Sequence, residues 1–342
     1  MNSTPSPAKP KSVLIICLRY LGDTLLLRPA LRALRVAFPE ARLDVVVTEG
    51  TACALDDCAD VSRVMEWPRR NVLRELLLAG GIARSGYDWV IDFTGNDRSA
   101  LVSLVSRAPF RAAYERPKLP AWSLRRAAYH FRPRHKKIKP HALLQRLELL
   151  EACGVPSQGI PFGLTPRADA LEALRKRWKT LPSGIFHAHV TSRDMQKAIP
   201  ADIVRQVLAA AIGNGGTVVL TCGTSTAERE HALLCTQGLP PEKFHTFHDL
   251  DWHELVAAIS LCGKYWGADT APAHIAAALG KNMLIHFGPS RAEHWHPLHP
   301  GGAADVQSCS CLKNKKMDCA RGIPGKCLQN IRVEEVIAWL KS

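Results

Sequence analysis

The sequence lacks the features that would place it in several common classes of protein. No apolar run approaches the roughly 20 residues needed to span a bilayer. Residues 1–11 are polar and proline-rich, without the apolar stretch of a signal peptide, so we expect a disordered lead-in and a cytoplasmic protein. No Gly-x-Gly-x-x-Gly motif follows the first apolar run, Val13–Leu18, which argues against a dinucleotide oxidoreductase.

Cysteine patterns typical of disulfide frameworks and zinc sites are also missing, although the chain has 11 cysteines. In a cytoplasmic chain we expect these to be free thiols. Cys309, Cys311, Cys319 and Cys327 lie in a lysine- and glycine-rich segment, at spacings unlike those of a paired Cys-x-x-Cys zinc site. For these four we expect reduced thiols or a local disulfide formed on oxidation, with a metal site as the less favoured alternative.

Acidic residues are scarce in one segment of a chain whose formal net charge is +14. Between Arg107 and Lys139, eleven lysines and arginines stand against one acid, Glu115. Such a segment can be a solvated basic face, a nucleic-acid patch, or a contact with anionic lipid and an acidic ligand. No recognised nucleic-acid motif accompanies it. We therefore expect no nucleic acid as a partner, and the other two interpretations stay open.

Short apolar runs alternate with helical patterns along the chain. The predicted strands are Val13–Leu18, Leu43–Thr48, Trp89–Phe93, Gly184–Ala188, Thr217–Thr221, Lys264–Gly267 and Asn282–Phe287. The predicted helices are Leu25–Ala37, His141–Ala152, Ala201–Ile212, Thr226–Cys235, Trp252–Leu261, Ala271–Leu279 and Val333–Lys341. This alternation predicts parallel sheets with helices on both faces. A proline- and glycine-rich linker at residues 155–166 separates two such α/β halves, for which 342 residues are sufficient.

Residues 266–280 are the most informative part of the sequence. They predict a short strand, a turn with Asp269 and Thr270, and a helix of small residues. Thr270 is a good N-cap, and Pro272 is tolerated in the first turn because an N–H there would have no helical partner. The start of such a helix binds anions, with His274 as a further donor, while Asp269 can accept from hydroxyls. The alternative is an ordinary strand–helix junction in which Asp269 is a second cap.

Four segments together resemble a known family. They are Leu18-Arg-Tyr-Leu-Gly-Asp-Thr24, Asp92-Phe-Thr-Gly-Asn-Asp-Arg-Ser-Ala100, Thr191-Ser-Arg-x-x-x-Lys197-x-x-Pro200, and Asp269-Thr-Ala-Pro-Ala-His274 with Phe287-Gly-Pro. In this order they resemble the motifs of glycosyltransferase family 9, the ADP-heptose:lipopolysaccharide heptosyltransferases, and are most similar to the heptosyltransferase III branch. The resemblance implies the GT-B architecture, in which two Rossmann-like domains face each other across a cleft that holds the active site.

The resemblance also implies where substrates bind. Residues 12–165 would form the acceptor-binding domain and residues 166–330 the donor-binding domain, with a helix in residues 331–342 packing back on the N-terminal domain. The implied acceptor-binding residues are Arg19, Asn96 and Arg98. The implied donor-binding residues are Thr191, Ser192, Lys197, Glu228, Leu250, Asp269, Thr270, Ala271 and His274.

Some of these residues have a second interpretation. Asp23 matches the family's catalytic base, which takes the proton of the acceptor hydroxyl, but an aspartate there also suits a helix N-cap. Glu228 either accepts from ribose hydroxyls or complements a helix dipole, and Lys197 either meets the diphosphate or is a surface lysine. Ala271 and Ile199 replace the family's glycine and tryptophan, which affects the details of donor binding.

The implied reaction is inverting transfer of a heptose from ADP-heptose to the inner core of lipopolysaccharide, with no cofactor and no essential divalent metal. We expect a monomer associated with the anionic inner face of the inner membrane. The alternatives are a sister enzyme for another nucleotide sugar or core position, and a non-catalytic nucleotide-binding protein at the membrane surface. Asp249 and Asp251 resemble a metal-binding Asp-x-Asp pair, but Asp251 with Glu254 predicts a capping box at a helix start.

Overall fold

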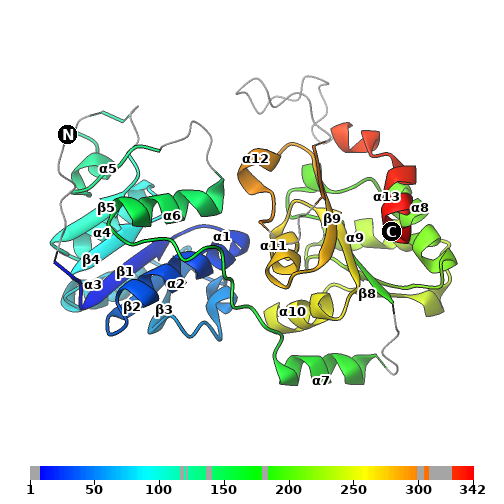
Figure 1. The fold of residues 1–342 in the computed structure, drawn as a ribbon, viewed down its shortest axis with the longest axis horizontal. Coiled ribbons are helices and arrows are strands. Elements are labelled where there is room, and N and C mark those ends of the chain that lie inside the picture. The colour runs from blue at the N-terminus through cyan, green and yellow to red at the C-terminus, as the bar shows by residue number, and fades with distance from the viewer. Residues whose placement is uncertain are drawn as a thin grey trace. The chain divides into compact units, whose positions relative to one another are not determined.

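The computed structural model of the chain describes residues 8–115, 119–120, 122–135, 141–178, 184–298, 304–307 and 326–342. The chain divides into two compact units, Met1–Gly163 (unit 1) and Leu164–Ser342 (unit 2), each with its own sheet (Figure 1). This boundary falls inside the predicted linker at residues 155–166. All strand pairings described in the two sheets are parallel. The predicted α/β fold with two Rossmann-like domains is therefore confirmed.

Unit 1 contains a five-stranded sheet in the order β3-β2-β1-β4-β5. Its strands are β1 (Ser12–Cys17), β2 (Arg42–Thr48), β3 (Arg63–Trp67), β4 (Trp89–Asp92) and β5 (Phe110–Ala113). Its helices are α1 (Leu21–Leu25), α2 (Arg28–Ala37), α3 (Val72–Arg84), α4 (Asp97–Val105), α5 (Leu124–Ala127) and α6 (Ala142–Ala152), with a 3₁₀ turn η1 (Ala52–Leu55). Side chains of α3 and α4 pack against Leu14 and Ile16 of β1 on one face, while α2 and α6 lie over the other (Figure 1). The central strand β1 is thus buried, and its carboxyl end lies at the sheet edge where ligands bind in such folds.

The region after β1 differs from the single predicted helix Leu25–Ala37. The structure has two helices there, α1 and α2, separated by Leu26 and Leu27. Pro29 explains the break, because it has no N–H to donate and its ring would clash with the carbonyl group four residues earlier. Asp23, which we expected in a loop, lies inside α1.

Unit 2 contains a six-stranded sheet in the order β11-β10-β9-β6-β7-β8. Its strands are β6 (Ile185–His189), β7 (Thr217–Thr221), β8 (Phe244–Phe247), β9 (Lys264–Ala268), β10 (Asn282–Phe287) and β11 (Ala304–Gln307). Its helices are α7 (Ala168–Arg177), α8 (Ala201–Gly213), α9 (Thr226–Thr236), α10 (Trp252–Ser260), α11 (Ala271–Ala278), α12 (Ala292–Trp295) and α13 (Val333–Lys341). The described part of this unit also contains the 3₁₀ turns η2 (Met195–Lys197), η3 (Pro241–Lys243) and η5 (Lys326–Asn330). The four strands predicted in this half match β6, β7, β9 and β10, whereas β8 and β11 have no counterpart among the predictions.

The C-terminal helix α13 makes extensive contacts within unit 2. Val336 and Trp339 pack on the core cluster that contains side chains of β6 and α8. Lys264 Nζ donates to the carbonyl oxygens of Trp339 and Leu340 at 2.6 and 3.0 Å. These contacts attach the end of the chain to β9 and α8. Packing of this helix on the N-terminal domain stays a prediction.

Gly267 lies where β9 approaches β6 closely. A Cβ atom at this position would be 2.4 Å from the carbonyl oxygen of His189, which is backbone and cannot swing away. A glycine in a strand often marks such a close approach of two backbones. Gly267 therefore permits the spacing of the two strands just before the turn that carries Asp269.

Candidate functional site

Asp23 lies in the first turn of α1, shortly after the carboxyl end of β1. Its Oδ1 accepts a hydrogen bond from Nη2 of Arg146 on α6 at 3.2 Å, and the two side chains are only 12% and 6% exposed. The N-cap position of α1 is Tyr20, so the interpretation of Asp23 as an N-cap is wrong. Arg146 therefore orients the carboxyl group of Asp23 in a largely buried position just beyond β1.

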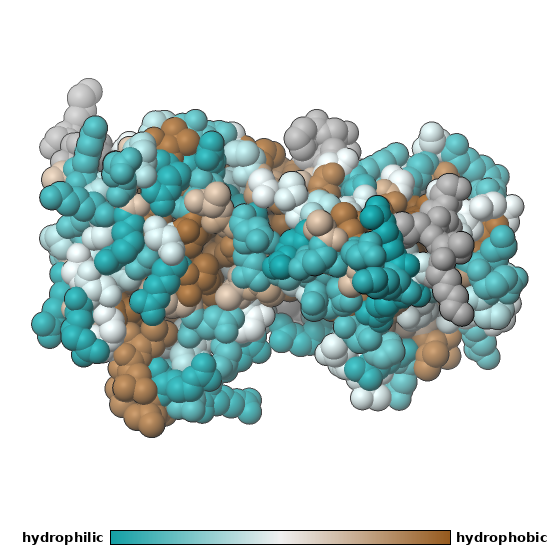
Figure 2. All heavy atoms as spheres, turned by 90° about the horizontal axis from the view of Figure 1, so that it is seen from below, coloured by the Kyte–Doolittle hydropathy of each residue, from teal (hydrophilic) through white to brown (hydrophobic). Residues whose placement is uncertain are grey.

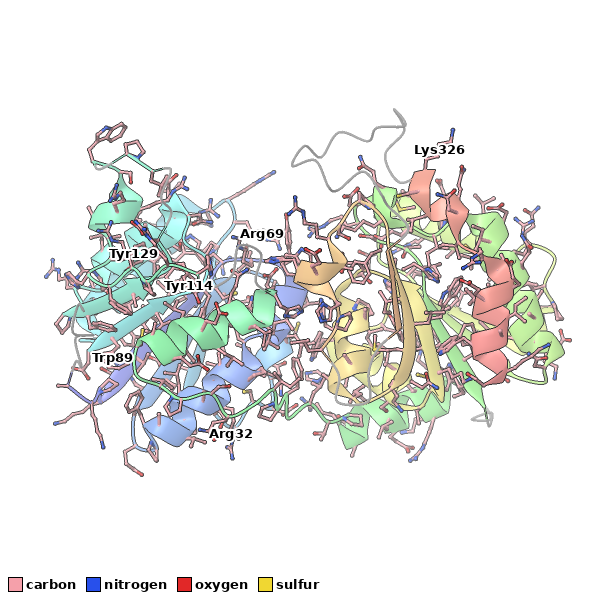
Figure 3. All side chains as sticks on the ribbon, turned by 45° about the horizontal axis from the view of Figure 1, so that its top comes forward. Arg32, Arg69, Trp89, Tyr114, Tyr129 and Lys326 are labelled. Carbon is pink, nitrogen blue, oxygen red and sulfur yellow. The ribbon has the colours of Figure 1, made fainter. Side chains whose placement is uncertain are left out.

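A second buried carboxylate, Asp92 at the end of β4, organises the neighbouring loop. Its Oδ2 accepts from the hydroxyl of Tyr129 (labelled in Figure 3) at 2.5 Å, and its Oδ1 from the N–H of Thr94 at 2.7 Å. Burial raises the pKa of Asp92. Thr94 in turn accepts from the N–H of Leu18 through Oγ1 at 2.7 Å and from Arg19 through its carbonyl oxygen at 3.3 Å. The network joins two of the motif segments, and no sequence pattern pointed to Tyr129.

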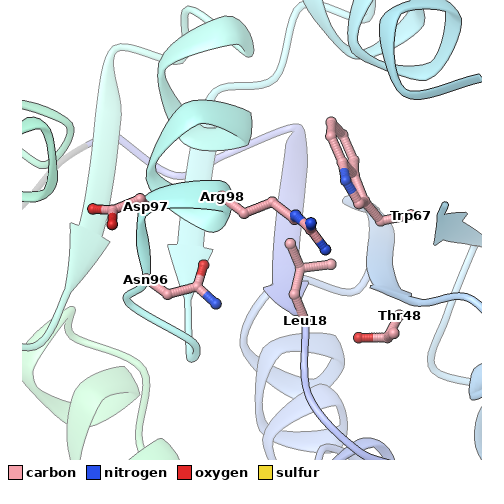
Figure 4. A pocket seen from close by; sticks show the side chains of 6 residues that line it. All are labelled: Leu18, Thr48, Trp67, Asn96, Asp97 and Arg98. Atoms are coloured by element: carbon pink, nitrogen blue, oxygen red, sulfur yellow. The ribbon is translucent and has the colours of Figure 1, made fainter. Parts of the chain in front are cut away.

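The implied acceptor-binding residues lie beside this network. Asn96 and Arg98 line a pocket of about 300 Å³ (Figure 4). Its other lining residues are Leu18, Thr48, Trp67 and Asp97. Figure 4 shows the Arg98 side chain extending from α4 toward Leu18 and Trp67. The Oδ1 of Asn96 accepts from the N–H of Ser99 at 2.9 Å and caps α4, so this oxygen is already engaged.

In unit 2, Lys197 and Asp269 meet although 72 residues separate them in the sequence. Lys197 ends η2, and its Nζ donates to Oδ2 of Asp269 at 3.0 Å. Asp269 is buried just beyond β9, whereas Lys197 is partly exposed. This pairing places an ammonium group beside the start of α11, where an anion would also meet the positive end of a helix dipole.

Helix α11 starts where the sequence predicts it, but its N-terminus is not capped by a side chain as predicted. Thr270 occupies the N-cap position and Pro272 lies in the first turn, as predicted. The Thr270 hydroxyl, however, does not cap the helix: it donates to the carbonyl oxygen of Ala268 at 3.4 Å. Ala271 is the first helical residue and His274, one turn in, is buried. The absence of a side-chain cap on α11 leaves this end suited to an external acceptor such as phosphate.

Glu228, in the first turn of α9, connects three segments at the carboxyl ends of β6 and β7. Its Oε2 accepts from the hydroxyl of Ser225 at 2.7 Å, and its Oε1 from the N–H of Gly223 at 3.2 Å and the hydroxyl of Thr191 at 3.3 Å. The neighbouring Ser192 is half-buried, and its Oγ accepts from a backbone N–H two residues later at 3.3 Å. The position of Glu228 agrees with the helix-dipole interpretation, and its contact with ribose stays a prediction.

Three buried histidines of unit 2 had not been singled out in the sequence. The Oγ1 of Thr221 on β7 lies 2.8 Å from Nε2 of His187 and 2.9 Å from Nδ1 of His189, both on β6. Burial lowers the pKa of His187 to about 3 and those of His189 and His286 to about 4, so all three are neutral at pH 7. The available signal was the alternation His187-Ala-His189, which places both rings on one face of a strand.

Leu250 and the Asp-x-Asp pair lie around the start of α10. Leu250 is partly buried against the apolar cluster that α7 and α10 share. Asp251 accepts from the N–H of Glu254 at 2.8 Å, and Glu254 accepts from the N–H of Asp251 at 3.1 Å. The predicted capping box is therefore confirmed. Asp249 instead pairs with Arg177 at 2.9 Å, so the two aspartates do not act as one site.

The described residues contain no group of three or more histidine, cysteine, aspartate or glutamate side chains that could hold a metal ion. The cysteines in this part of the chain are free thiols, including the buried Cys327. Cys309, Cys311 and Cys319 lie outside the described residues. For that segment, reduced thiols or a local disulfide stay the prediction, with a metal site as the less favoured alternative.

The basic segment Arg107–Lys139 uses part of its charge within unit 1. Arg125 makes two hydrogen bonds to Asp97, at 2.5 and 2.9 Å, and Arg134 pairs with Glu115 at 2.5 Å. Arg111 donates to two backbone carbonyl oxygens at 2.7 and 2.8 Å. Arg116, Lys118, Lys136, Lys137 and Lys139 lie outside the described residues. The segment therefore has less free positive charge than its own sequence suggests, because Asp97, which pairs with Arg125, lies before it in the chain.

The comparisons with known proteins decide the family. The model for glycosyltransferase family 9 (heptosyltransferase) matches residues 77–323. The chain belongs to this family. This family 9 glycosyltransferase is 24% identical over 293 residues to lipopolysaccharide heptosyltransferase 3 of Escherichia coli K12, a match that covers 82% of the chain and 83% of that protein.

Solved structures share the fold of this family 9 enzyme. ADP-heptose lps heptosyltransferase II of E. coli has a TM-score of 0.78 at 18% identity, with 96% of this chain and 97% of that chain covered. E. coli heptosyltransferase WaaC with ADP has a TM-score of 0.70 at 21% identity, with 96% and 97% covered. The family resemblance and the GT-B fold class expected from the sequence are confirmed. The roles of individual site residues stay predictions.

Proposed function

We propose that this family 9 enzyme transfers a heptose from ADP-heptose to the inner core of lipopolysaccharide, with inversion at the anomeric carbon. Family membership and the likeness to lipopolysaccharide heptosyltransferase 3 support the sugar and the acceptor. The observation that carries the proposed mechanism is the buried Asp23–Arg146 pair, which provides a carboxylate just beyond β1. The solved relative WaaC with ADP supports an adenine nucleotide as the donor.

In the proposed reaction, the acceptor hydroxyl oxygen attacks the anomeric carbon while the bond from that carbon to the diphosphate oxygen breaks. Asp23 takes the hydroxyl proton, and ADP departs with the electron pair of the broken bond. Arg146 orients the carboxyl group of Asp23 through their hydrogen bond, so that one carboxyl oxygen has a fixed position. Asn96 and Arg98 would hold an acidic group of the acceptor in the pocket of unit 1, with Arg19 beside them.

The donor would be bound by residues of unit 2. Lys197 and the start of α11, with Thr270, Ala271 and His274, would stabilise the charge on the departing diphosphate. The remaining proposed donor contacts are Asp269 and Glu228 to hydroxyls, Thr191 and Ser192 to the diphosphate, and Leu250 to adenine. The chemistry needs no cofactor and no divalent metal, because protein groups supply both the base and the positive charge. We further propose a monomer at the cytoplasmic face of an anionic membrane.

Replacement of Asp23 by asparagine tests the base. Turnover with purified acceptor should fall by at least about 10²-fold, because the amide cannot take the proton. Thermal protection by ADP should not change, since the proposed donor residues belong to unit 2. Asp249→Asn, which removes a carboxylate from an ion pair elsewhere, is the control and should keep normal turnover. Near-normal turnover in Asp23→Asn would place the base at another residue.

Thermal-shift titration tests the donor. ADP should protect the enzyme more than UDP or GDP does, and Lys197→Ala should weaken this protection by up to about 1.5–3 kcal/mol, the usual contribution of a charge-assisted hydrogen bond. The exposed Lys243 of η3 provides the control, because Lys243→Ala should leave the titration unchanged. An equal response to ADP, UDP and GDP would contradict the adenine donor.

A further inference from the structure

Helix α3 of unit 1 exposes a row of large apolar side chains. Val72, Leu73, Leu76 and Leu77 are 65–71% exposed. Their spacing puts all four on one side of the helix, while Ile82 on the opposite side is buried in the core of unit 1. Figure 2 shows strongly hydrophobic side chains gathered on a projection at the lower left, in the unit that carries α3. We call these four side chains the α3 face.

The α3 face is bordered by positive charge. Arg69 (labelled in Figure 3) and Arg70 are exposed in the turn just before the helix, and Arg74 lies in its first turn. Glu49 pairs with Arg74 at 2.8 Å and also accepts from the backbone N–H of Arg69 at 3.2 Å, and Glu75 is half-buried. For Arg69 and Arg70, the described part of the chain shows no ion pair. Leucines beside exposed arginines are the combination that binds an anionic lipid surface, with apolar groups in the acyl boundary and guanidinium groups at the headgroups.

The charges also argue against a second copy of this chain as the occupant of the α3 face. A two-fold interface would place the same patch of each copy against the other. Such an interface would press two copies of a patch bordered by the same positive charges against each other, and like charges brought together at an interface are costly. An anionic bilayer has the opposite charge to Arg69 and Arg70 and is therefore favoured as the occupant of the α3 face.

The α3 face is also close to the acceptor pocket. Trp67, which ends β3 and lines the pocket, is five residues before Val72 in the sequence. Helix α3 packs against α4, the helix that contributes Arg98 to the pocket. A glycolipid could therefore keep its lipid part in a membrane next to α3 while its sugars reach the pocket.

We propose that the α3 face inserts into the surface of an anionic membrane and brings the acceptor pocket to a lipid-anchored acceptor. The need for a lipid-anchored acceptor rests on the proposed function, but membrane insertion of α3 does not. The inserted groups are the four side chains of the α3 face, and Arg69 and Arg70 contact lipid phosphates. The basic segment Arg107–Lys139 is secondary in this arrangement.

Sedimentation with vesicles of phosphatidylethanolamine and phosphatidylglycerol, free of any acceptor, tests the insertion. The double variant Leu73→Gln/Leu77→Gln should bind at least about tenfold more weakly than the wild type, because two leucine side chains no longer enter the lipid. Leu233→Gln/Leu234→Gln on α9 of unit 2 is the matched control, since these leucines are 68% and 51% exposed. The control should bind as the wild type does. Vesicles of phosphatidylcholine alone should bind the wild type weakly.

Enzyme assays separate this proposal from the proposed function. The α3 double variant should keep normal turnover on a soluble, lipid-free core oligosaccharide and lose turnover on the same acceptor anchored in vesicles. If the wild type fails on both acceptors, the proposed function is wrong, and vesicle binding still decides the role of α3. Equal vesicle binding by the wild type and the α3 double variant would overturn insertion. So would light scattering that shows a wild-type dimer and a monomeric α3 double variant.

Discussion

Unit 1 and unit 2 have the same parallel α/β architecture, but they hold the residues at the carboxyl ends of their strands by different means. In unit 1 the groups are carboxylates with specific partners. Asp23 is paired with Arg146, and Asp92 receives hydrogen bonds from Tyr129 and from the loop that follows it. The geometry of this edge depends on ionisable groups buried in the interior.

In unit 2 the corresponding edge is held mainly by neutral partners and close backbone packing, because the buried carboxylate of Glu228 accepts from hydroxyls and a backbone N–H. His187 and His189 share the hydroxyl of Thr221, and their low pKa values keep them uncharged. Gly267 permits β9 to lie against β6 without a clash. The Lys197–Asp269 ion pair at the proposed donor site is partly exposed. The edge of unit 1 therefore depends on a buried ion pair, whereas that of unit 2 depends on neutral hydrogen-bond partners and close backbone packing. The two edges should respond to different substitutions.

The largest effect should come from breaking the buried pair of unit 1. Arg146→Met leaves the carboxylate of Asp23 buried without a partner, and removal of one member of such a pair costs about 3–5 kcal/mol. We expect hydrogen exchange to show faster opening at β1 and little change at β6. The double variant Arg146→Met/Asp23→Leu should recover part of this stability. Unchanged exchange at β1 would mean that solvent already screens the pair.

A change of shape should have the next largest effect, and in unit 2. Gly267→Ala places a Cβ atom where the carbonyl oxygen of His189 lies, and overpacking of this kind costs about 1–3 kcal/mol. Hydrogen exchange should accelerate at β6 and β9 but not at β1. Gly263→Ala is the control, because the nearest atom to its added Cβ is 3.9 Å away. Equal effects of the two substitutions would show that the sheet relaxes at Gly267.

Sequence rules were most successful where the structure depends on neighbouring residues. The capping box at Asp251 and the position of Pro272 in α11 follow from spacings of a few residues, and both are found. The break before α2 had a local signal in Pro29, but the apolar pattern was interpreted as one continuous helix. In helix α3 the leucines at positions 76, 77 and 78 follow one another, so apolar side chains point to more than one side of the helix. The sequence therefore shows no polar side that would mark α3 as amphipathic.

Contacts between distant segments could not be predicted in the same way. The bonds Tyr129–Asp92 and Lys197–Asp269 join residues far apart in the chain, and only the strand order brings them together. The family resemblance suggested that Lys197 and Asp269 bind one substrate, but it did not predict that the two side chains contact each other. No sequence motif pointed to Arg146 on α6 as the partner of Asp23.

Acid should act in opposite directions on the two edges, with a smaller effect for each titrating group than either substitution above. The pKa values of His187 and His189, about 3 and about 4, lie below the unfolded value of 6.5. Below pH 6.5 the unfolded chain therefore binds protons that folded unit 2 does not, and each histidine should remove about 1 kcal/mol of stability between pH 7 and 5.5. The pKa of Asp92 is raised, so this group favours unit 1 as the pH falls. Hydrogen exchange at both pH values should show the difference.

Variants that preserve the hydrogen bonds of these histidines provide the control for the pH experiment. In His187→Gln and His189→Asn, an amide nitrogen or oxygen takes approximately the position of the ring nitrogen that contacts Thr221. Neither amide side chain titrates. The double variant should therefore lose the part of the acid sensitivity of unit 2 that His187 and His189 cause, while His286 keeps its own part. If its stability falls with pH as steeply as that of the wild type, other groups cause the dependence.

The smallest effect should come from the basic segment of unit 1. Arg125 is already paired with Asp97, so Arg125→Glu/Arg126→Glu removes less free positive charge than the sequence suggests. We expect this variant to bind anionic vesicles more weakly than the wild type but better than Leu73→Gln/Leu77→Gln. Its response to added salt should be reduced, because screened headgroup contacts are what it loses. ADP titration should be unchanged, since the proposed donor residues belong to unit 2. A loss of vesicle binding greater than that of the α3 double variant would make the basic segment, and not α3, the main membrane contact of unit 1.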